Sequence, residues 1–173
     1  SDIISFVEQL FNENVVNYQF SPRVFDNSIM WLQSRTVQKH GEAGTEGRAE
    51  VVSQFENEFV LIYHNSFSFQ RAFRDGSLMQ QMRALKRFSK SKKNDLKVIV
   101  LFNSVSDSLF NNENPLQGGE GAVSRGEFER FLIELTLSFE FDFLELYSPI
   151  EIIEFLREVH LSIKDKPHRK ELS

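Results

Sequence analysis

The sequence predicts an α/β domain with a central, mostly parallel sheet flanked by helices. Two continuous apolar runs, at 58–63 and 96–102, are typical of strands buried on both faces. From residue 58 onward the predicted elements alternate in the order β, α, α, β, α, β, α, which favours parallel strands joined by helices. The length of 173 residues fits a single domain.

The composition excludes several classes of protein. The chain is 40% hydrophobic and 26% charged, which is typical of a globular domain, and it contains no apolar run long enough for a membrane span. Because there is no cysteine, the sequence offers no disulfide, thiolate nucleophile or Cys-based metal site. The four histidines show no ligand spacing, so we predict no metal bound by this chain.

The N-terminal third is predicted to contain one helix and two short strands. Apolar residues at helical spacing predict the helix over residues 3–11. Alternating or β-branched residues predict strands at 15–20 and 27–33. Residues 35–57 contain three glycines and mixed charges, so we interpret them as a long loop that leads into the first buried strand.

Two helices are predicted between the buried strands. The first covers residues 66–74 and is ended by Gly76, a residue common after helix C-termini. The second covers residues 78–89, where apolar side chains recur at helical spacing. The residues predicted to point inward from this second helix are Leu78, Met82 and Leu85, with Phe88 as a further candidate.

The C-terminal part is predicted to contain two helices and a strand. Residues 103–122, rich in Asn, Ser and Gly, are interpreted as a flexible insertion. Ser124 and Glu127 form a capping-box pattern that opens a helix, a strand-like run follows at 141–146, and Pro149 begins the last helix. The predicted apolar stripes are Phe128, Phe131, Leu132, Leu135 and Phe139 in the first helix, and Ile152, Ile153, Leu156, Val159 and Ile163 in the second.

Positive charge is concentrated between residues 71 and 97. This segment has nine basic and two acidic residues, a net charge of +7, whereas the whole chain carries −5 and the remainder therefore −12. Such a segment can bind phosphates by point charge, or it can be an ordinary solvated surface. The candidate DNA-binding residues are Arg83, Lys86, Arg87, Lys90, Lys92 and Lys93.

The residues expected at an α/β active site are missing. Functional groups in such folds gather where the central strands end, but the two buried strands run into His64-Asn65 and Asn103-Ser104, without an acid. The glycines at 118–121 follow no strand directly and favour a linker over a phosphate-binding loop. His64 is the one candidate for Ser/His/Asp chemistry, with a structural histidine as the alternative.

One segment resembles a known family. Residues 60–81, V-L-I-Y-H-N-S-F-S-F-Q-R-A-F-R-D-G-S-L-M-Q-Q, resemble the active-site region of the XPF/MUS family of structure-specific endonucleases. In that family a strand carrying E-R-K-x-x-x-D is followed by a short helix, a glycine turn and a helix that begins near L-x-x-Q. Aligned through Gly76, Leu78 and Gln81, the family's metal-linked positions fall on Ile62, Tyr63, His64 and Ser68. The resemblance implies a restriction-endonuclease-like, XPF-type nuclease domain with a degenerate motif.

Three further segments resemble the non-catalytic EME-type (essential meiotic endonuclease) subunit of the crossover junction endonuclease. They are Val123-Ser124-Arg125 after the insertion, a basic exit from the last helix at Lys166-Pro167-His168-Arg169-Lys170, and Ile29-Met30-Trp31 at the sheet edge. The resemblance covers the chain from about residue 27. It implies one nuclease-like domain over residues 1–173, without the first strand and the helix-hairpin-helix domain of the family.

The resemblance also implies a function. The chain would be the inactive subunit of a nuclear heterodimer with a MUS-type catalytic subunit, acting in DNA repair and meiotic recombination. The pair would cleave three-prime flaps, replication forks and nicked Holliday junctions, with magnesium held by the partner and no cofactor on this chain. In the family the last two helices and the strand between them contact the partner. Phe143 and Phe155 lie off the stripes assigned above, so they are interface candidates or members of a second core layer.

Two alternatives remain open at the level of the sequence. The chain could be an active nuclease with unfamiliar ligands among Asp75, Asp107 and Glu58, which cleavage of a labelled flap by the isolated domain would reveal. It could also be an XPF-like meiotic recombination scaffold that binds branched DNA without belonging to a nuclease. The identity of the partner separates that scaffold from the inactive subunit.

Overall fold

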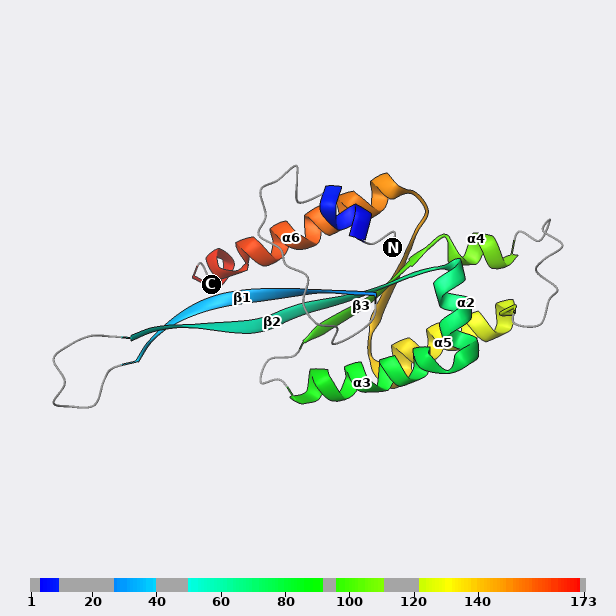
Figure 1. Ribbon diagram of the computed structural model, residues 1–173, viewed down its shortest axis with the longest axis horizontal. Helices are drawn as coiled ribbons and strands as arrows, with labels where there is room; N and C mark the ends of the chain where they lie inside the picture. Colours follow the sequence, from blue (N-terminus) through cyan, green and yellow to red (C-terminus); the bar gives the residue numbers. More distant parts are fainter. Residues whose placement is uncertain (1–3, 10–26, 40–49, 92–95, 111–121, 172–173) are drawn as a thin grey trace.

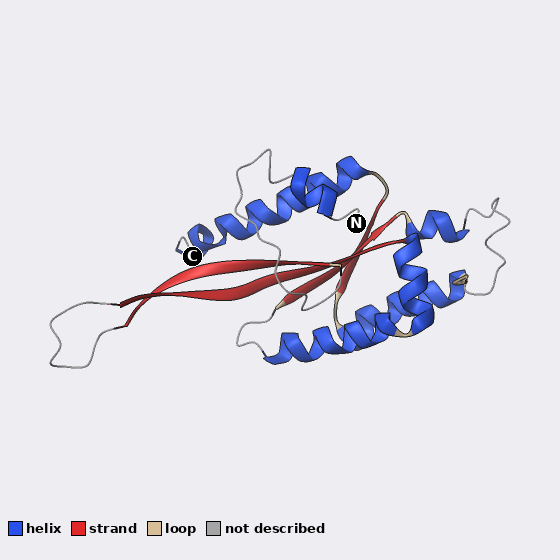
Figure 2. Ribbon diagram, in the orientation of Figure 1, coloured by secondary structure: helices blue, strands red, loops and turns tan. Residues whose placement is uncertain are grey.

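A mixed sheet lies at the centre of the computed structural model, with helices on both faces (Figures 1 and 2). The structure describes residues 4–9, 27–39, 50–91, 96–110 and 122–171, and within them the side chains of 4–9, 27–31, 59–91, 96–110 and 122–163. The strand predicted at 15–20 lies outside these residues. Among the described helices, none has both the length and the apolar character needed to cross a bilayer.

The described part of the sheet has four strands in the order β1-β2-β3-β4. Their bounds are Ser28–Lys39 for β1, Glu50–Asn65 for β2, Lys97–Asn103 for β3 and Asp142–Leu146 for β4. β1 pairs antiparallel with β2, whereas the β2/β3 and β3/β4 pairs are parallel. The predicted α/β class is therefore confirmed, the sheet is mixed with its parallel pairs at β2/β3 and β3/β4, and the two apolar runs form the adjacent central strands.

β1 and β2 continue beyond the sheet as a two-stranded arm. Their pairing runs from Ser28↔Ile62 to Lys39↔Glu50, but β3 pairs only with residues 59–65 of β2. The outer halves of the two strands consequently project from the sheet (Figure 1). The loop predicted for 35–57 is wrong over 35–39 and 50–57. The sequence of these segments lacks a regular alternation of apolar and polar residues, which is the pattern by which a strand is predicted.

One face of the sheet is covered by helices α2 to α5 and by the π-helix η2. Their bounds are Ser66–Asp75 for α2, Ser77–Ser91 for α3, Val105–Phe110 for α4, Arg125–Glu134 for α5 and Leu135–Phe139 for η2. The other face is covered by α6, Pro149–Glu171, and by the short helix at residues 4–9. α6 extends through 166–170, so the segment that resembles a basic exit from the last helix forms the C-terminal end of this helix.

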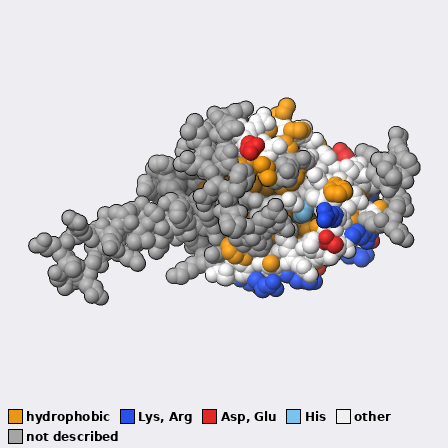
Figure 3. All heavy atoms as spheres, in the orientation of Figure 1, with side chains coloured by type: hydrophobic (Ala, Val, Ile, Leu, Met, Phe, Trp, Pro, Cys, Tyr) orange, Lys and Arg blue, Asp and Glu red, His pale blue; other side chains and the backbone are white. Residues whose placement is uncertain are grey.

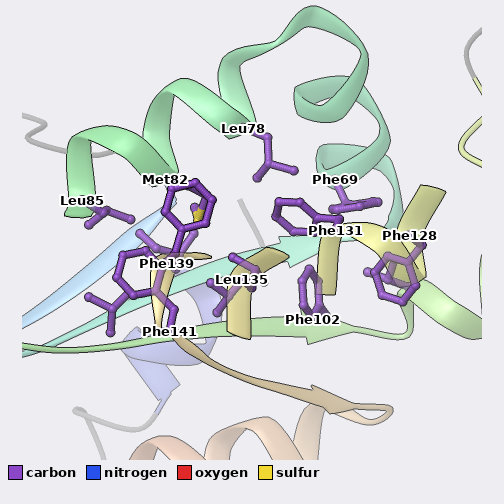
Figure 4. Close-up of a cluster of buried hydrophobic side chains, with 14 of the residues drawn as sticks. Phe69, Leu78, Met82, Leu85, Phe102, Phe128, Phe131, Leu135, Phe139 and Phe141 are labelled. Carbon is purple, nitrogen blue, oxygen red and sulfur yellow. The ribbon is translucent and has the colours of Figure 1, made fainter. Parts of the chain in front are cut away.

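The side chains of β2 and β3 alternate between two apolar clusters. Val60 and Ile62 belong to the cluster under α2–α5, whereas Leu61 and Tyr63 belong to the cluster under α6. Phe69 lies at the centre of the first cluster, with ring centroids 5.3 to 5.7 Å from those of Phe102, Phe128 and Phe131 (Figure 4). This aromatic packing accounts for part of the unusual phenylalanine content.

Most of the predicted helix signals are confirmed. Gly76 ends α2 in the left-handed conformation, with φ of 79°. Ser124 and Glu127 form the predicted capping box of α5. The inward positions predicted for α3 are buried. The flexible insertion predicted for 103–122 is wrong in its first part, because α4 packs Val105 and Leu109 into the core; residues 111–121 are outside the described part.

Candidate functional site

The four residues that align with the XPF/MUS motif in the resemblance lie where β2 runs into α2, and their side chains pack or form hydrogen bonds within the fold. Ile62, Tyr63 and His64 are all buried. The Tyr63 hydroxyl accepts a hydrogen bond of 2.8 Å from the Asn103 side chain, which joins the ends of β2 and β3. A metal ligand must present an oxygen or nitrogen to an open site, so these three positions contain no group suited to hold magnesium.

His64 is a structural residue in this fold. Its Nδ1 lies 3.1 Å from Ser68 Oγ, and its ring packs edge-on against Phe69. Burial lowers the pKa of His64 from 6.5 to about 4, and a hydrogen bond with Gln81 opposes this effect only in part. The imidazole is therefore neutral at pH 7 and shielded from solvent, which does not suit a general base that must meet a substrate.

Ser68, at the position of the family's Asp, is committed to the start of α2. The backbone N–H of Ser68 donates to Asn65 Oδ1 at 2.8 Å, and the backbone N–H of Asn65 donates to Ser68 Oγ at 3.1 Å. This reciprocal capping box satisfies two backbone donors that the first turn of a helix leaves open. The hydroxyl therefore stabilises the helix start in place of binding a metal.

An acid that the sequence analysis did not single out, Glu145, does lie at the same edge of the sheet, but its carboxylate is occupied. Glu145 Oε2 accepts a hydrogen bond from the Ser106 backbone N–H at 2.9 Å, and Oε1 accepts from the hydroxyls of Ser106 and Tyr147. Among the described residues no three His, Asp or Glu side chains are grouped so that they could hold a metal ion. The carboxylate instead holds α4 against β4.

The three alternative metal ligands do not form a site in the described part. Asp75 is exposed at the end of α2, and its pKa is lowered by hydrogen bonds from the Ser77 side chain and from the Ser77 backbone N–H, which donates to Oδ1 at 2.8 Å. Asp107 is in the first turn of α4. Glu58 belongs to β2, and its side chain is outside the described set.

The predicted DNA-binding residues divide into two groups. Arg83, Arg87 and Lys90 are exposed on α3, and Figure 3 shows Lys and Arg side chains gathered along the lower edge, where α3 lies. Lys86 is only 22% exposed, and its ammonium group donates to the Phe139 carbonyl oxygen at 2.7 Å. Lys92 and Lys93 are outside the described residues.

The two interface candidates also differ. Phe155 is partly buried and packs against the cluster under α6, as in the alternative of a second core layer. Phe143, on the edge strand β4, is 40% exposed. The structure has further exposed apolar side chains, which the sequence analysis did not identify as interface candidates. Their position outside the predicted apolar stripes is the signal that could have identified them. They are Ile4, Phe67, Ile133, Leu137, Tyr147, Ile150 and Leu161.

Comparison with known proteins adds no relative. No protein-family model and no curated protein matches the sequence. The features of the chain that bear on function are the residues at the end of β2, the exposed apolar side chains and the basic residues of α3.

Proposed function

We propose that this chain is the catalytically inactive subunit of a heterodimeric, structure-specific DNA endonuclease. It would pair in the nucleus with a MUS-type catalytic subunit and act on branched DNA in repair and meiotic recombination. The observation that carries the proposal is the state of the β2–α2 junction, where the four positions of the family motif are buried or used for helix capping.

The chemistry of phosphodiester hydrolysis explains why this junction points to an inactive subunit. Such hydrolysis commonly uses metal ions that activate water and stabilise the developing negative charge. In the proposed heterodimer the magnesium and its acidic ligands would belong to the partner. This chain would contribute a contact surface for that partner and a second surface for the DNA.

Exposed apolar residues support the idea of a protein partner. Phe143 and Tyr147 lie on or just after the edge strand β4, and Ile150 lies at the start of α6. Large apolar side chains left in water favour burial against another protein surface. Phe155 is no longer a candidate for the partner interface, because it is partly buried and packs against the core cluster under α6.

Co-purification with a MUS-type catalytic nuclease domain tests the proposal. We expect a stable heterodimer that cuts a labelled three-prime flap in magnesium, while this chain alone does not cut it. A Phe143→Ser variant should weaken the pair, and Phe67→Ser, on α2, should not. Cleavage by this chain alone would contradict the proposal. Failure to pair, with binding to branched DNA retained, would favour the recombination scaffold.

A further inference from the structure

We infer that one face of α3 binds the phosphate backbone of double-stranded nucleic acid without reading its sequence. This face, here called the α3 basic face, consists of Arg83, Arg87 and Lys90. The inference deepens the proposed function, since it places the contact surface for DNA. It depends on the charges and contacts of α3 itself and does not use the resemblance of residues 60–81.

The three residues form one line along the helix. They are spaced i, i+4 and i+7, which places their side chains on the same side of an α-helix over an axial distance of about 10 Å. All three are exposed, and in the described part of the chain no acidic side chain forms an ion pair with any of them. The α3 basic face therefore presents three cations to the solvent.

The charge pattern of α3 differs from that of a helix charged only for solubility. Solvated helices usually mix both signs, and Glu–Lys pairs at i, i+4 stabilise them. α3 contains four basic residues and no acid, with Arg83 and Arg87 at i, i+4. Like charges at this spacing destabilise a helix by about 0.2 to 0.5 kcal/mol per pair. A polyanion bound along the helix would remove this repulsion.

Lys86 is excluded from the α3 basic face by its contacts. Besides its bond to the Phe139 carbonyl, its Nζ lies 3.5 Å from a carboxylate oxygen of Glu140 and 5.9 Å from the centroid of the Phe141 ring. These contacts turn the side chain toward the C-terminal end of η2. Lys86 therefore gives a variant on the same helix that removes one positive charge without altering the proposed surface.

The absence of stacking groups on this helix favours a duplex over a single strand. Proteins that bind single strands combine cations with exposed aromatic rings on which the bases stack. The one aromatic residue of α3, Phe88, is partly buried against the core. Lys and Arg that contact phosphates as point charges fix position on the nucleic acid but do not select a sequence.

The salt dependence of duplex binding by this chain tests the inference. The affinity for a labelled random-sequence DNA duplex would be measured by fluorescence anisotropy over a series of salt concentrations. For three phosphate contacts, the slope of log K against log salt should lose about 2.7 units in the triple variant Arg83→Gln, Arg87→Gln, Lys90→Gln. The single variant Lys86→Gln should leave the slope unchanged.

A second triple variant controls for net charge. Arg71→Gln, Arg125→Gln and Arg130→Gln remove the same three charges from exposed positions on α2 and α5. This control should keep the slope of the unaltered chain. The inference would be overturned if the slope of log K against log salt fell equally in both triple variants, or if it did not fall in the α3 variant. Displacement of the duplex by polyglutamate of matched charge would overturn it in favour of an acidic protein.

The result of this binding test can be distinguished from the result of the test of the proposed function. A heterodimer that forms and cleaves flaps, with duplex binding unaffected by the α3 variant, would refute the α3 basic face and leave the proposed function standing. Salt-dependent duplex binding through α3, in a chain that pairs with no catalytic subunit, would support the inference and refute the proposed function.

Discussion

His64 is the one buried histidine among the described residues, and it sets an expected pH dependence. Its pKa is lowered to about 4 by burial, whereas in the unfolded chain it returns toward 6.5. Between these two values the unfolded chain binds a proton that the folded chain does not. The contribution of His64 to the free energy of unfolding therefore has its full value above pH 6.5, and it declines as the pH falls toward 4.

We expect this contribution to decline by up to about 1.4 kcal/mol per pH unit within that window. Urea unfolding of the unaltered chain and of His64→Asn at several pH values between 7 and 4 measures it. The difference in the free energy of unfolding between the two chains should shrink as the pH falls, because His64 titrates only in the unaltered chain. The carboxylates titrate in both chains, so their effect cancels in the difference. An NMR titration midpoint for His64 near 6.5 would contradict the burial argument.

Lys86 is expected to act on stability rather than on binding. Replacing it by Gln removes a charged donor from the Phe139 carbonyl oxygen, which should lower the free energy of unfolding by about 1 to 2 kcal/mol. The matched variant Lys90→Gln lies one turn along α3 and is exposed, so it should change stability by less than about 0.5 kcal/mol. Denaturant unfolding compares them; equal effects would refute the assigned role of Lys86.

At the scale of elements, two glycines near helix ends should respond in opposite directions to alanine. Gly76 has φ of 79°, where a Cβ is strained, so Gly76→Ala should destabilise the chain by about 1 kcal/mol. Gly126 lies inside the first turn of α5, and a Cβ there meets nothing within 4 Å. Gly126→Ala should therefore stabilise the chain by up to about 1 kcal/mol. Thermal unfolding of both variants measures the signs, and a shift of both in one direction would contradict this account.

α4 shows how an element can depend on a distant one. Six residues are too few for a helix that is stable on its own. The helix forms here because Glu145, on β4, accepts hydrogen bonds from Ser106, and because Val105 and Leu109 enter the core. Its polar surroundings in the sequence favour a loop, so the prediction of a flexible insertion failed at this point.

At the scale of the whole molecule, α6 should be required for a closed fold. Its residues Ile152, Ile153 and Leu156 cover the face of the sheet that carries Leu61 and Leu101. Removing residues 149–173 would expose that apolar face, and we expect the product to bind a hydrophobic dye and lose cooperative unfolding. Removing only 164–173 keeps these contacts and should preserve the cooperative transition. A cooperative transition in the shorter product would contradict the two-sided core.

In the whole molecule, the two proposed surfaces lie on different elements. The exposed apolar residues Phe143, Tyr147 and Ile150 belong to β4, the segment after it and the start of α6, whereas the cations Arg83, Arg87 and Lys90 belong to α3. α3 lies on the face of the sheet opposite to α6 (Figure 1). Ile150 and these cations therefore lie on opposite faces, whereas Phe143, whose ring centroid is 6.4 Å from that of Phe102, lies at the edge of the sheet on the side of α3.

The α/β class, the two buried strands, the stripes of α3, α5 and α6, and the helix signals at Gly76 and Ser124 could all be predicted from the amino-acid sequence. These features are local, because periodicity, capping and left-handed turns act over a few residues. Three features are visible only in the folded chain: β1 and β2 extend as an arm, α4 is a helix, and the Lys86 side chain turns away from the α3 basic face. Two of these depend on a partner far along the chain, since Ser106 and Glu145 are 39 residues apart and Lys86 and Phe139 are 53 apart, whereas the arm pairs nearer segments, with Lys39 opposite Glu50 at its outer end. Burial, hydrogen bonds and pKa values at such positions arise only when the fold brings distant segments together.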